Sequence, residues 1–323
     1  MSTDILLSNE VIIFLFIESL LLCILFIAIY FTSIILKNWN FNSTTSSQYK
    51  LEKQSYLVTV IIYFTLIVKL FLVPYFAYTV DILSAIVPGA MCGAGVISSN
   101  DYGESLLILK IIMLFLVSSW LIINKLDIQK KNFPYLKKKF LYFILIFTFI
   151  ILEFILDILY FTDISTLSIA TCCSAIYSSD GSINPLPLGL NLDSLLISFY
   201  LLYILTFISN IKQNRYLSGI SNISFLYIAY YAILYFFGTY VYELPTHHCP
   251  FCMLQKDYYY IGYFIFISLF LGVFFGMVNS ILSILTKDSI IKYYKYSNIF
   301  NTLFVAICTL YVIVYYIKNG VLL

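Results

Sequence analysis

Eight long hydrophobic runs alternate with short polar connections along the chain. A helix needs about 20 apolar residues to cross the hydrocarbon core of a bilayer, and most of these runs reach that length. The runs are too long for strands of a membrane barrel, and they do not alternate between polar and apolar positions. The pattern therefore predicts an all-α, polytopic membrane helix bundle with about eight transmembrane helices, at Val11–Leu36, Tyr56–Val80, Ser105–Asn124, Phe140–Phe161, Leu195–Ser209, Ile220–Tyr242, Tyr258–Leu285 and Ile299–Ile317.

Composition agrees with this pattern, because 62% of the residues are hydrophobic and only 11% are charged. A soluble chain of this length could not keep so much apolar surface from water. The formal net charge is +2, so we expect no nucleic-acid partner. We expect residues 1–323 to form a single integral membrane domain in a lipid bilayer, as a multi-pass protein of the plasma (inner) membrane.

The connections between the runs differ in charge and so predict an orientation. Positively charged loops stay on the cytoplasmic side. Alternate connections hold nearly all the loop cations, whereas the other set holds only Lys256, with Lys318 in the C-terminal tail. Both termini are therefore expected outside. The cations of the inner set are Lys37, Lys50, Lys53, Lys125, Lys130, Lys131, Lys137, Lys138, Lys139, Lys212, Arg215, Lys287, Lys292 and Lys295.

This orientation places thiols in every outer loop that joins two helices. Cys92 lies in the first, Cys172 and Cys173 in the second, and Cys249 and Cys252 in the third. The extracytoplasmic side of a bacterial membrane is oxidising and permits disulfides. One interpretation of the outer cysteines is therefore structural, as disulfides that staple the loops together.

The third outer loop is the strongest candidate for chemistry, because His247, His248, Cys249 and Cys252 lie within six residues of one another. A Cys-x-x-Cys pair can close a small disulfide ring. We expect Cys249 to stand at the start of the seventh helix, where the partial positive charge of a helix N-terminus favours a thiolate. The two histidines could add positive charge or shuttle a proton. Lys256 could stabilise a thiolate or an anionic cofactor.

The segment Cys-Pro-Phe-Cys-Met-Leu-Gln-Lys at Cys249–Lys256, followed by an aromatic helix that contains Gly262, resembles the quinone-facing segment of the disulfide bond formation protein B family. The match covers about a dozen residues, and Lys256 stands where that family has Arg. The resemblance implies a redox-active Cys249–Cys252 pair that passes electrons to a membrane quinone, ubiquinone or menaquinone. The cofactor-binding residues expected around it are Gln255, Lys256, His247 and His248.

The same resemblance implies a second outer cysteine pair and a soluble periplasmic partner with a thioredoxin fold. Cys92 with Cys172 or Cys173 could serve as that pair. Electrons would then pass by thiol–disulfide exchange to Cys249 and Cys252 and on to quinone. The sequence leaves the direction of electron flow open.

A metal site is the alternative interpretation of the third loop. His247, Cys249 and Cys252 supply three ligands within six residues. Thiolate and imidazole ligands favour copper(I), zinc or mercury(II), so soft-metal binding or transport is the competing function.

Five ionisable residues fall inside the predicted helices, where such residues are costly and usually functional. Counted at 1.5 Å per residue, all five lie within roughly 17 Å of the outer boundary. Lysines and carboxylates could neutralise one another there as structural ion pairs. The sharper hypothesis is a proton path beneath the thiols. The five residues are Glu18, Lys69, Lys110, Glu153 and Asp157.

Overall fold

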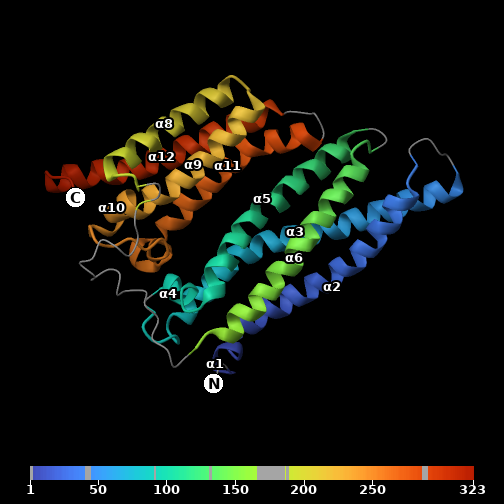
Figure 1. Cartoon of the computed structure of the whole chain (residues 1–323), viewed down its shortest axis with the longest axis horizontal. Helices are drawn as coiled ribbons and strands as arrows, with labels where there is room; N and C mark the ends of the chain where they lie inside the picture. Colours follow the sequence, from blue (N-terminus) through green and yellow to red (C-terminus); the bar gives the residue numbers. More distant parts are fainter. Residues whose placement is uncertain are drawn as a thin grey trace. The chain divides into compact units, whose positions relative to one another are not determined.

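The computed structural model describes residues 3–40, 45–90, 92–130, 133–165, 186, 189–285 and 290–323, and every regular element among them is helical (Figure 1). The contacts within the chain divide it into two compact units. Unit 1 is Met1–Thr171 and unit 2 is Cys172–Leu323. The prediction of one membrane domain over residues 1–323 concerns the association of these units, and it stays a prediction.

Eight helices in the described part of the chain are long and apolar enough to cross a membrane, which confirms the predicted spans. Most of them extend a few residues beyond the hydrophobic runs, because backbone hydrogen bonding continues through the polar residues at each end. The observed spans are Asn9–Asn38, Ser46–Leu83, Asp101–Gln129, Leu136–Asp163, Leu192–Ile211, Arg215–Tyr242, Ile261–Ser283 and Ile291–Asn319.

Unit 1 is built on four long helices with two short ones. Helix α2 packs against α3 and α6, and α5 packs against α6 and α3. Large apolar side chains from all four long helices, such as Leu25, Ile62, Trp120 and Phe143, form its buried core. Its elements are α1 (Thr3–Leu6), α2 (Asn9–Asn38), α3 (Ser46–Leu83), α4 (Gly93–Ile97), α5 (Asp101–Gln129) and α6 (Leu136–Asp163).

One end of unit 1 is held together around α4. Asn100 caps α5 by accepting hydrogen bonds from the backbone N–H groups of Tyr102 and Gly103. The Asn100 amide also donates to the Tyr160 carbonyl, and the Tyr160 hydroxyl donates to the Val96 carbonyl of α4. These bonds fix the α4–α5 corner on the last turns of α6 and close that end of the bundle.

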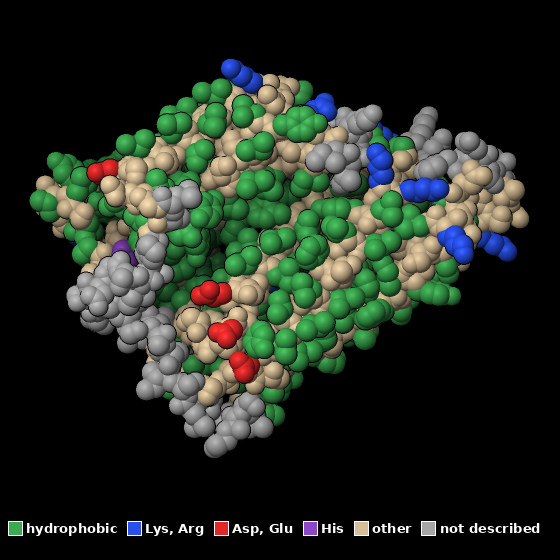
Figure 2. Space-filling model, viewed as in Figure 1, with side chains coloured by type: hydrophobic (Ala, Val, Ile, Leu, Met, Phe, Trp, Pro, Cys, Tyr) green, Lys and Arg blue, Asp and Glu red, His purple; other side chains and the backbone are tan. Residues whose placement is uncertain are grey.

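Charged side chains are unevenly distributed over the surface of unit 1. Figure 2 shows hydrophobic side chains along the flanks of its long helices, while Lys and Arg side chains gather at the end that holds the α2–α3 and α5–α6 connections. An apolar flank between two polar ends is what a bilayer requires of a spanning bundle. The distribution supports the lipid environment predicted from the sequence.

Unit 2 also contains four spans, and its second span is irregular. That span runs as α9 (Arg215–Ala232), a π-helical turn η2 (Ile233–Phe237) and α10 (Gly238–Tyr242). Helix α11 packs against α9 and α12, and α8 packs against α9 and α12. The other elements are α8 (Leu192–Ile211), the 3-10 turns η3 (Cys252–Leu254) and η4 (Lys256–Tyr258), α11 (Ile261–Leu285) and α12 (Ile291–Asn319).

Candidate functional site

The two cysteines of the third predicted outer loop lie in unit 2, between α10 and α11. Helix α10 ends at Tyr242, and the next residue, Glu243, has a left-handed backbone with φ of 53°. Cys252 begins the short turn η3, and α11 starts only at Ile261. The prediction that Cys249 stands at a helix start is therefore wrong. Tyr259 and Tyr260 have left-handed backbone conformations, which a right-handed α-helix cannot include. Helix α11 therefore cannot extend back through them to the dithiol.

The sulfur atoms of this turn are close together. The Sγ atoms of Cys249 and Cys252 lie within 4.8 Å of each other. Cys252 is 9% exposed, and Cys249 is half-buried. The Cys-x-x-Cys spacing thus forms a compact dithiol with one sulfur more accessible than the other.

Tyr242, the last residue of α10, holds the dithiol turn in place. Its hydroxyl donates to the Cys249 carbonyl and accepts a hydrogen bond of 3.1 Å from the Met253 backbone N–H. A single side chain therefore connects the backbone on both sides of the Cys-x-x-Cys turn. The Tyr258 ring packs edge-on against the Tyr242 ring, with centroids 4.7 Å apart.

The two histidines contact aromatic rings. The His247 ring packs on Tyr242, with centroids 4.1 Å apart. Among the described residues, His247 does not join the two sulfurs in a group of ligand atoms within 4.8 Å, so the predicted metal set of His247, Cys249 and Cys252 is not assembled. His248 packs on Tyr235, with centroids 5.2 Å apart.

The π-helical turn determines the tautomer of His248. Nδ1 of His248 lies 3.0 Å from the carbonyl oxygen of Leu234, inside η2. A carbonyl can only accept, so Nδ1 carries the hydrogen, and Nε2 of the neutral ring is an acceptor. A π-helical turn alters the regular hydrogen-bond pattern of a helix and often occurs at functional sites. Here it presents a backbone acceptor to the histidine beside the dithiol.

The predicted cofactor residues Gln255 and Lys256 follow the dithiol directly. Gln255 is half-buried between η3 and η4, and Lys256 is exposed at the first position of η4. Burial raises the pKa of the Tyr258 phenol above its ordinary value, and negative charge on a Cys252 thiolate and on Asp257 would raise this pKa further. Tyr258 therefore stays protonated at neutral pH as a hydrogen-bond donor.

Gly262 allows the dithiol turn to pack closely on α11. A Cβ atom at this position would lie 2.5 Å from Cγ of Met253 and 2.9 Å from Cδ2 of Leu254. Met253 is 1% exposed and fills the space that the glycine leaves. The Cys252–Leu254 turn is thus a packed element of unit 2.

A second candidate site lies inside unit 1, where all four long helices contribute charged side chains. Lys69 Nζ lies 2.8 Å from Glu18 Oε2 and 2.8 Å from Glu153 Oε2. Lys110 Nζ lies 2.9 Å from Glu153 Oε1 and 2.9 Å from Asp157 Oδ1. None of these five side chains is more than 4% exposed. The structure therefore brings together all five ionisable residues singled out in the sequence, and we call them the ionic network.

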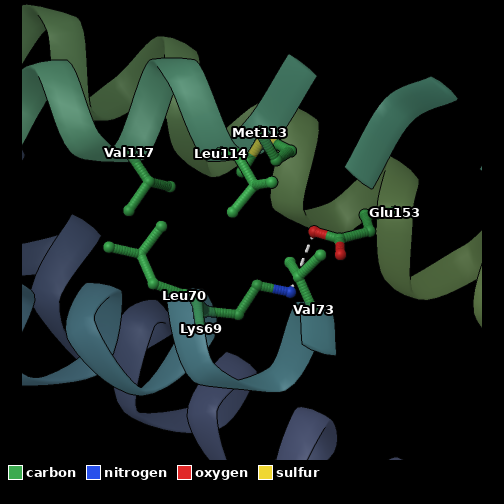
Figure 3. Close-up of a pocket in the computed structure, with 7 residues that line it drawn as sticks. All are labelled: Lys69, Leu70, Val73, Met113, Leu114, Val117 and Glu153. Atoms are coloured by element: carbon green, nitrogen blue, oxygen red, sulfur yellow. Dashed lines mark ion pairs between the residues drawn. The ribbon is translucent and has the colours of Figure 1, made fainter. Parts of the chain in front are cut away.

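The surroundings of the ionic network are apolar. Lys110 Nζ lies 4.9 Å from the centre of the Phe14 ring and 4.6 Å from that of Phe76. Figure 3 shows Lys69 reaching toward Glu153, with aliphatic side chains from α3 and α5 nearby. These residues line a small cavity of about 10 Å³. A space of this size holds about one water molecule. The proton path from the network to the dithiol stays a prediction.

The structure contains a buried ion pair near the α5–α6 connection that the sequence pattern does not predict. Lys139 Nζ lies 2.8 Å from Asp127 Oδ2 and donates to the Asn124 side chain at 3.1 Å. Asp127 also accepts a 2.9 Å hydrogen bond from the Tyr135 backbone N–H. The prediction that placed Lys139 in an inner loop is wrong, because α6 begins at Leu136 and carries this lysine inward to its partner.

A neutral polar cluster in unit 2 was also missed. Asn210, Ser218, Asn222, Ser297 and Asn301 are buried and joined by hydrogen bonds of their side chains. The sequence carried a signal, since Ser218 and Asn222, and likewise Ser297 and Asn301, are spaced four residues apart on one helix face. We call these five residues the amide network.

The second predicted thiol pair lies only partly within the described residues. Cys92 lies in unit 1, immediately before α4, and is 1% exposed. Cys172 and Cys173 lie outside the described residues. Exchange of a disulfide between Cys92 and the dithiol turn depends on the placement of unit 1 and unit 2, so it stays a prediction.

Comparison with protein-family models, with curated proteins and with solved structures finds no match to this chain.

Proposed function

We propose that the Cys249–Cys252 turn is the redox centre of a membrane thiol–disulfide oxidoreductase that exchanges electrons with a quinone. The observation that carries the proposal is the pair of sulfurs within 4.8 Å of each other in a turn anchored by Tyr242. A disulfide needs the sulfurs about 2 Å apart, so side-chain rotation closes most of the remaining gap. The packed backbone around the turn can then stay the same in both redox states.

The reaction is balanced without another reactant. The two thiols lose two electrons and two protons and form one S–S bond. The quinone ring takes up both electrons and both protons and becomes a hydroquinone. Either direction of this exchange is consistent with the dithiol, because direction is set by the reduction potentials of the two couples.

Several neighbouring groups suit this chemistry. The acceptor nitrogen Nε2 of His248 can take a thiol proton, since Nδ1 already donates to Leu234. The exposed ammonium of Lys256 can interact with a quinone oxygen on which negative charge develops. We assign His248 to proton transfer and Lys256, with Gln255, to quinone binding.

The proposed setting is the plasma membrane, with the dithiol and both termini on the extracytoplasmic side. The support is the accumulation of Lys and Arg in alternate connections. In this orientation Cys92 with Cys172 or Cys173 would receive electrons from, or deliver them to, a soluble periplasmic protein with a thioredoxin fold. The buried charges of unit 1 would then lie in the outer half of the bilayer.

The test uses the purified full chain in lipid nanodiscs with a ubiquinone or menaquinone analogue. Thiols are counted by mass after alkylation, before and after the quinone is added. We expect two alkylatable thiols to be lost for each quinone reduced. Cys249→Ser and Cys252→Ser should abolish the change. Tyr242→Phe, which keeps the ring but loses both hydrogen bonds, should slow it at least several-fold.

Cys23→Ser is the matched control, because Cys23 is an exposed thiol in the middle of α2 and should leave the quinone reaction unchanged. An unchanged thiol count with excess quinone in both redox directions would rule out the proposed activity. Copper or zinc bound in the purified chain and lost in Cys249→Ser would instead identify the turn as a soft-metal site.

A further inference from the structure

The ionic network of unit 1 contains three carboxyl groups and only two ammonium groups. Glu18 comes from α2, Lys69 from α3, Lys110 from α5, and Glu153 and Asp157 from α6. If all five were ionised, the network would carry a net charge of −1 inside an apolar bundle. An unbalanced charge in such surroundings is strongly unfavourable unless a cation neutralises it.

The three carboxyl groups are close enough together to interact electrostatically. One oxygen from each of Glu18, Glu153 and Asp157 lies within 4.8 Å of the other two. Neighbouring carboxylates at this separation repel, and the usual solution is a shared proton. Releasing a proton from Lys69 or Lys110 would increase the excess of negative charge, so the lysines cannot supply the balance.

Two of the carboxyl oxygens are candidate positions for the shared proton. Glu153 Oε2 and Asp157 Oδ1 are buried and accept no well-aligned hydrogen bond among the described residues, although each lies within 2.9 Å of a lysine Nζ. Glu153 also borders the cavity of Figure 3, beside Lys69. A water molecule in that cavity would stand next to the network as a proton carrier.

We propose that the ionic network is a proton-binding site that holds one proton per chain, shared among its three carboxyl groups. The bound proton and the two ammonium groups together neutralise the negative charge of the three carboxylates. A metal ion is a poor alternative occupant. The two ammonium groups already lie 2.8 to 3.0 Å from the carboxylate oxygens and would repel it.

Other titratable groups around the network do not supply the missing charge. Tyr160, one turn beyond Asp157, is a buried phenol that donates to the Val96 carbonyl. Helix α4, which packs near this end of the unit, has no ionisable side chain. The buried pair of Asp127 and Lys139 is balanced by itself.

This site is independent of the dithiol chemistry. The balanced dithiol–quinone exchange neither gains nor loses protons overall, so it needs no reservoir in unit 1. Uptake or loss of the proton would change the net charge at the centre of four helices. The network would therefore couple the packing of unit 1 to the pH at the membrane face from which the proton arrives.

The test is infrared spectroscopy of the full chain in nanodiscs, followed over pH. We expect the carbonyl stretch of one protonated carboxyl group per chain at neutral pH, shifted in heavy water and lost at high pH. Asp157→Asn and Glu18→Gln each leave two carboxylates for two lysines, so either substitution should remove the band, whichever carboxyl group holds the proton.

Asp127→Asn is the matched control, since Asp127 belongs to the balanced pair and its loss should leave the band unchanged. Cys249→Ser should keep the band as well, which separates this proposal from the redox proposal. A neutral-pH spectrum of the unmodified chain without the band would overturn the proposal. A band that persists in both charge-balanced variants would do the same. If the variants do not fold, the unmodified chain alone decides.

Discussion

The ionic network of unit 1 and the amide network of unit 2 both place polar side chains inside an apolar helix bundle, but they satisfy those side chains in different ways. All four spans of unit 1 contribute side chains to the ionic network. The amide network takes its side chains from α8, α9 and α12, and α11 adds two backbone carbonyls that accept hydrogen bonds from them. Unit 1 uses long, charged side chains, and Lys110 Nζ on α5 contacts carboxylates on the neighbouring helix α6. Unit 2 uses short, neutral ones. Long side chains can join helices over a wider separation than short ones can.

Short side chains require helix backbones to approach closely, and unit 2 provides this with glycines. The Ser218 hydroxyl donates to the Gly276 carbonyl at 3.1 Å, and the Ser297 hydroxyl donates to the Gly272 carbonyl at 2.7 Å. Small residues spaced four apart commonly allow such contacts between membrane helices. The amide network therefore depends on shape, whereas the ionic network depends on charge balance.

The largest loss of stability should follow removal of a charged side chain from the ionic network. Lys110→Met deletes the ammonium group that contacts Glu153 and Asp157, leaving buried carboxylates without compensation. We expect the free energy of unfolding to fall by about 3–5 kcal/mol. Thermal or denaturant unfolding in mixed micelles measures this effect. Lys256→Met, at an exposed lysine, is the control, and a loss below about 1 kcal/mol for Lys110→Met would contradict the charge-balance argument.

An intermediate loss of stability is expected when a methyl group is added where α9 and α11 pack closely in unit 2. In Gly276→Ala the added Cβ would lie 2.2 Å from Nδ2 of Asn222, so α9 and α11 must move apart. Overpacking of this kind lowers the free energy of unfolding by about 1–3 kcal/mol. The double variant Gly276→Ala/Asn222→Ala removes the obstructing amide. Strict additivity in that double-mutant cycle would argue against direct contact between the two positions.

The smallest effect is expected at an exposed pair in unit 2. Lys318 Nζ lies 3.0 Å from Glu243 Oε1, and the two side chains are 62% and 54% exposed. Lys318→Met should change the free energy of unfolding by less than about 1 kcal/mol, because water screens the pair. The same unfolding assay applies, with an equal effect from Glu243→Gln. A loss as large as that of Lys110→Met would show that burial does not distinguish these ion pairs.

The candidate sites could be predicted from sequence to different extents. Charged residues inside hydrophobic runs are rare enough to be recognised singly, and Lys69, Lys110 and Glu153 were found in this way. Their pairing followed from the need to neutralise one another in an apolar setting. The dithiol was found from its spacing, but its backbone was predicted wrongly. Hydrophobicity continued through Tyr259 and Tyr260, and their left-handed conformation left no mark on that pattern.

Other contacts had no signal along the chain. Tyr242 is one of 30 tyrosines, and nothing in its neighbours indicates that its hydroxyl bridges Cys249 and Met253. The sequence also gives no indication of the π-helical turn that presents the Leu234 carbonyl to His248. The hydrophobic pattern begins the fourth span at Phe140 and so predicts Lys139 in an inner loop, yet Asp127 supplies a buried partner.

The chain alone determined the number of spans, their approximate bounds and the need for charge compensation inside unit 1. These properties follow from the free energy of placing apolar and charged groups in hydrocarbon, which each residue carries with it wherever it lies. Tertiary structure decided which lysine contacts which carboxylate, that Tyr242 holds the dithiol turn, and that two glycines bring α11 against the amide network. Those outcomes depend on distances between residues far apart in sequence, which are defined only when the helices pack.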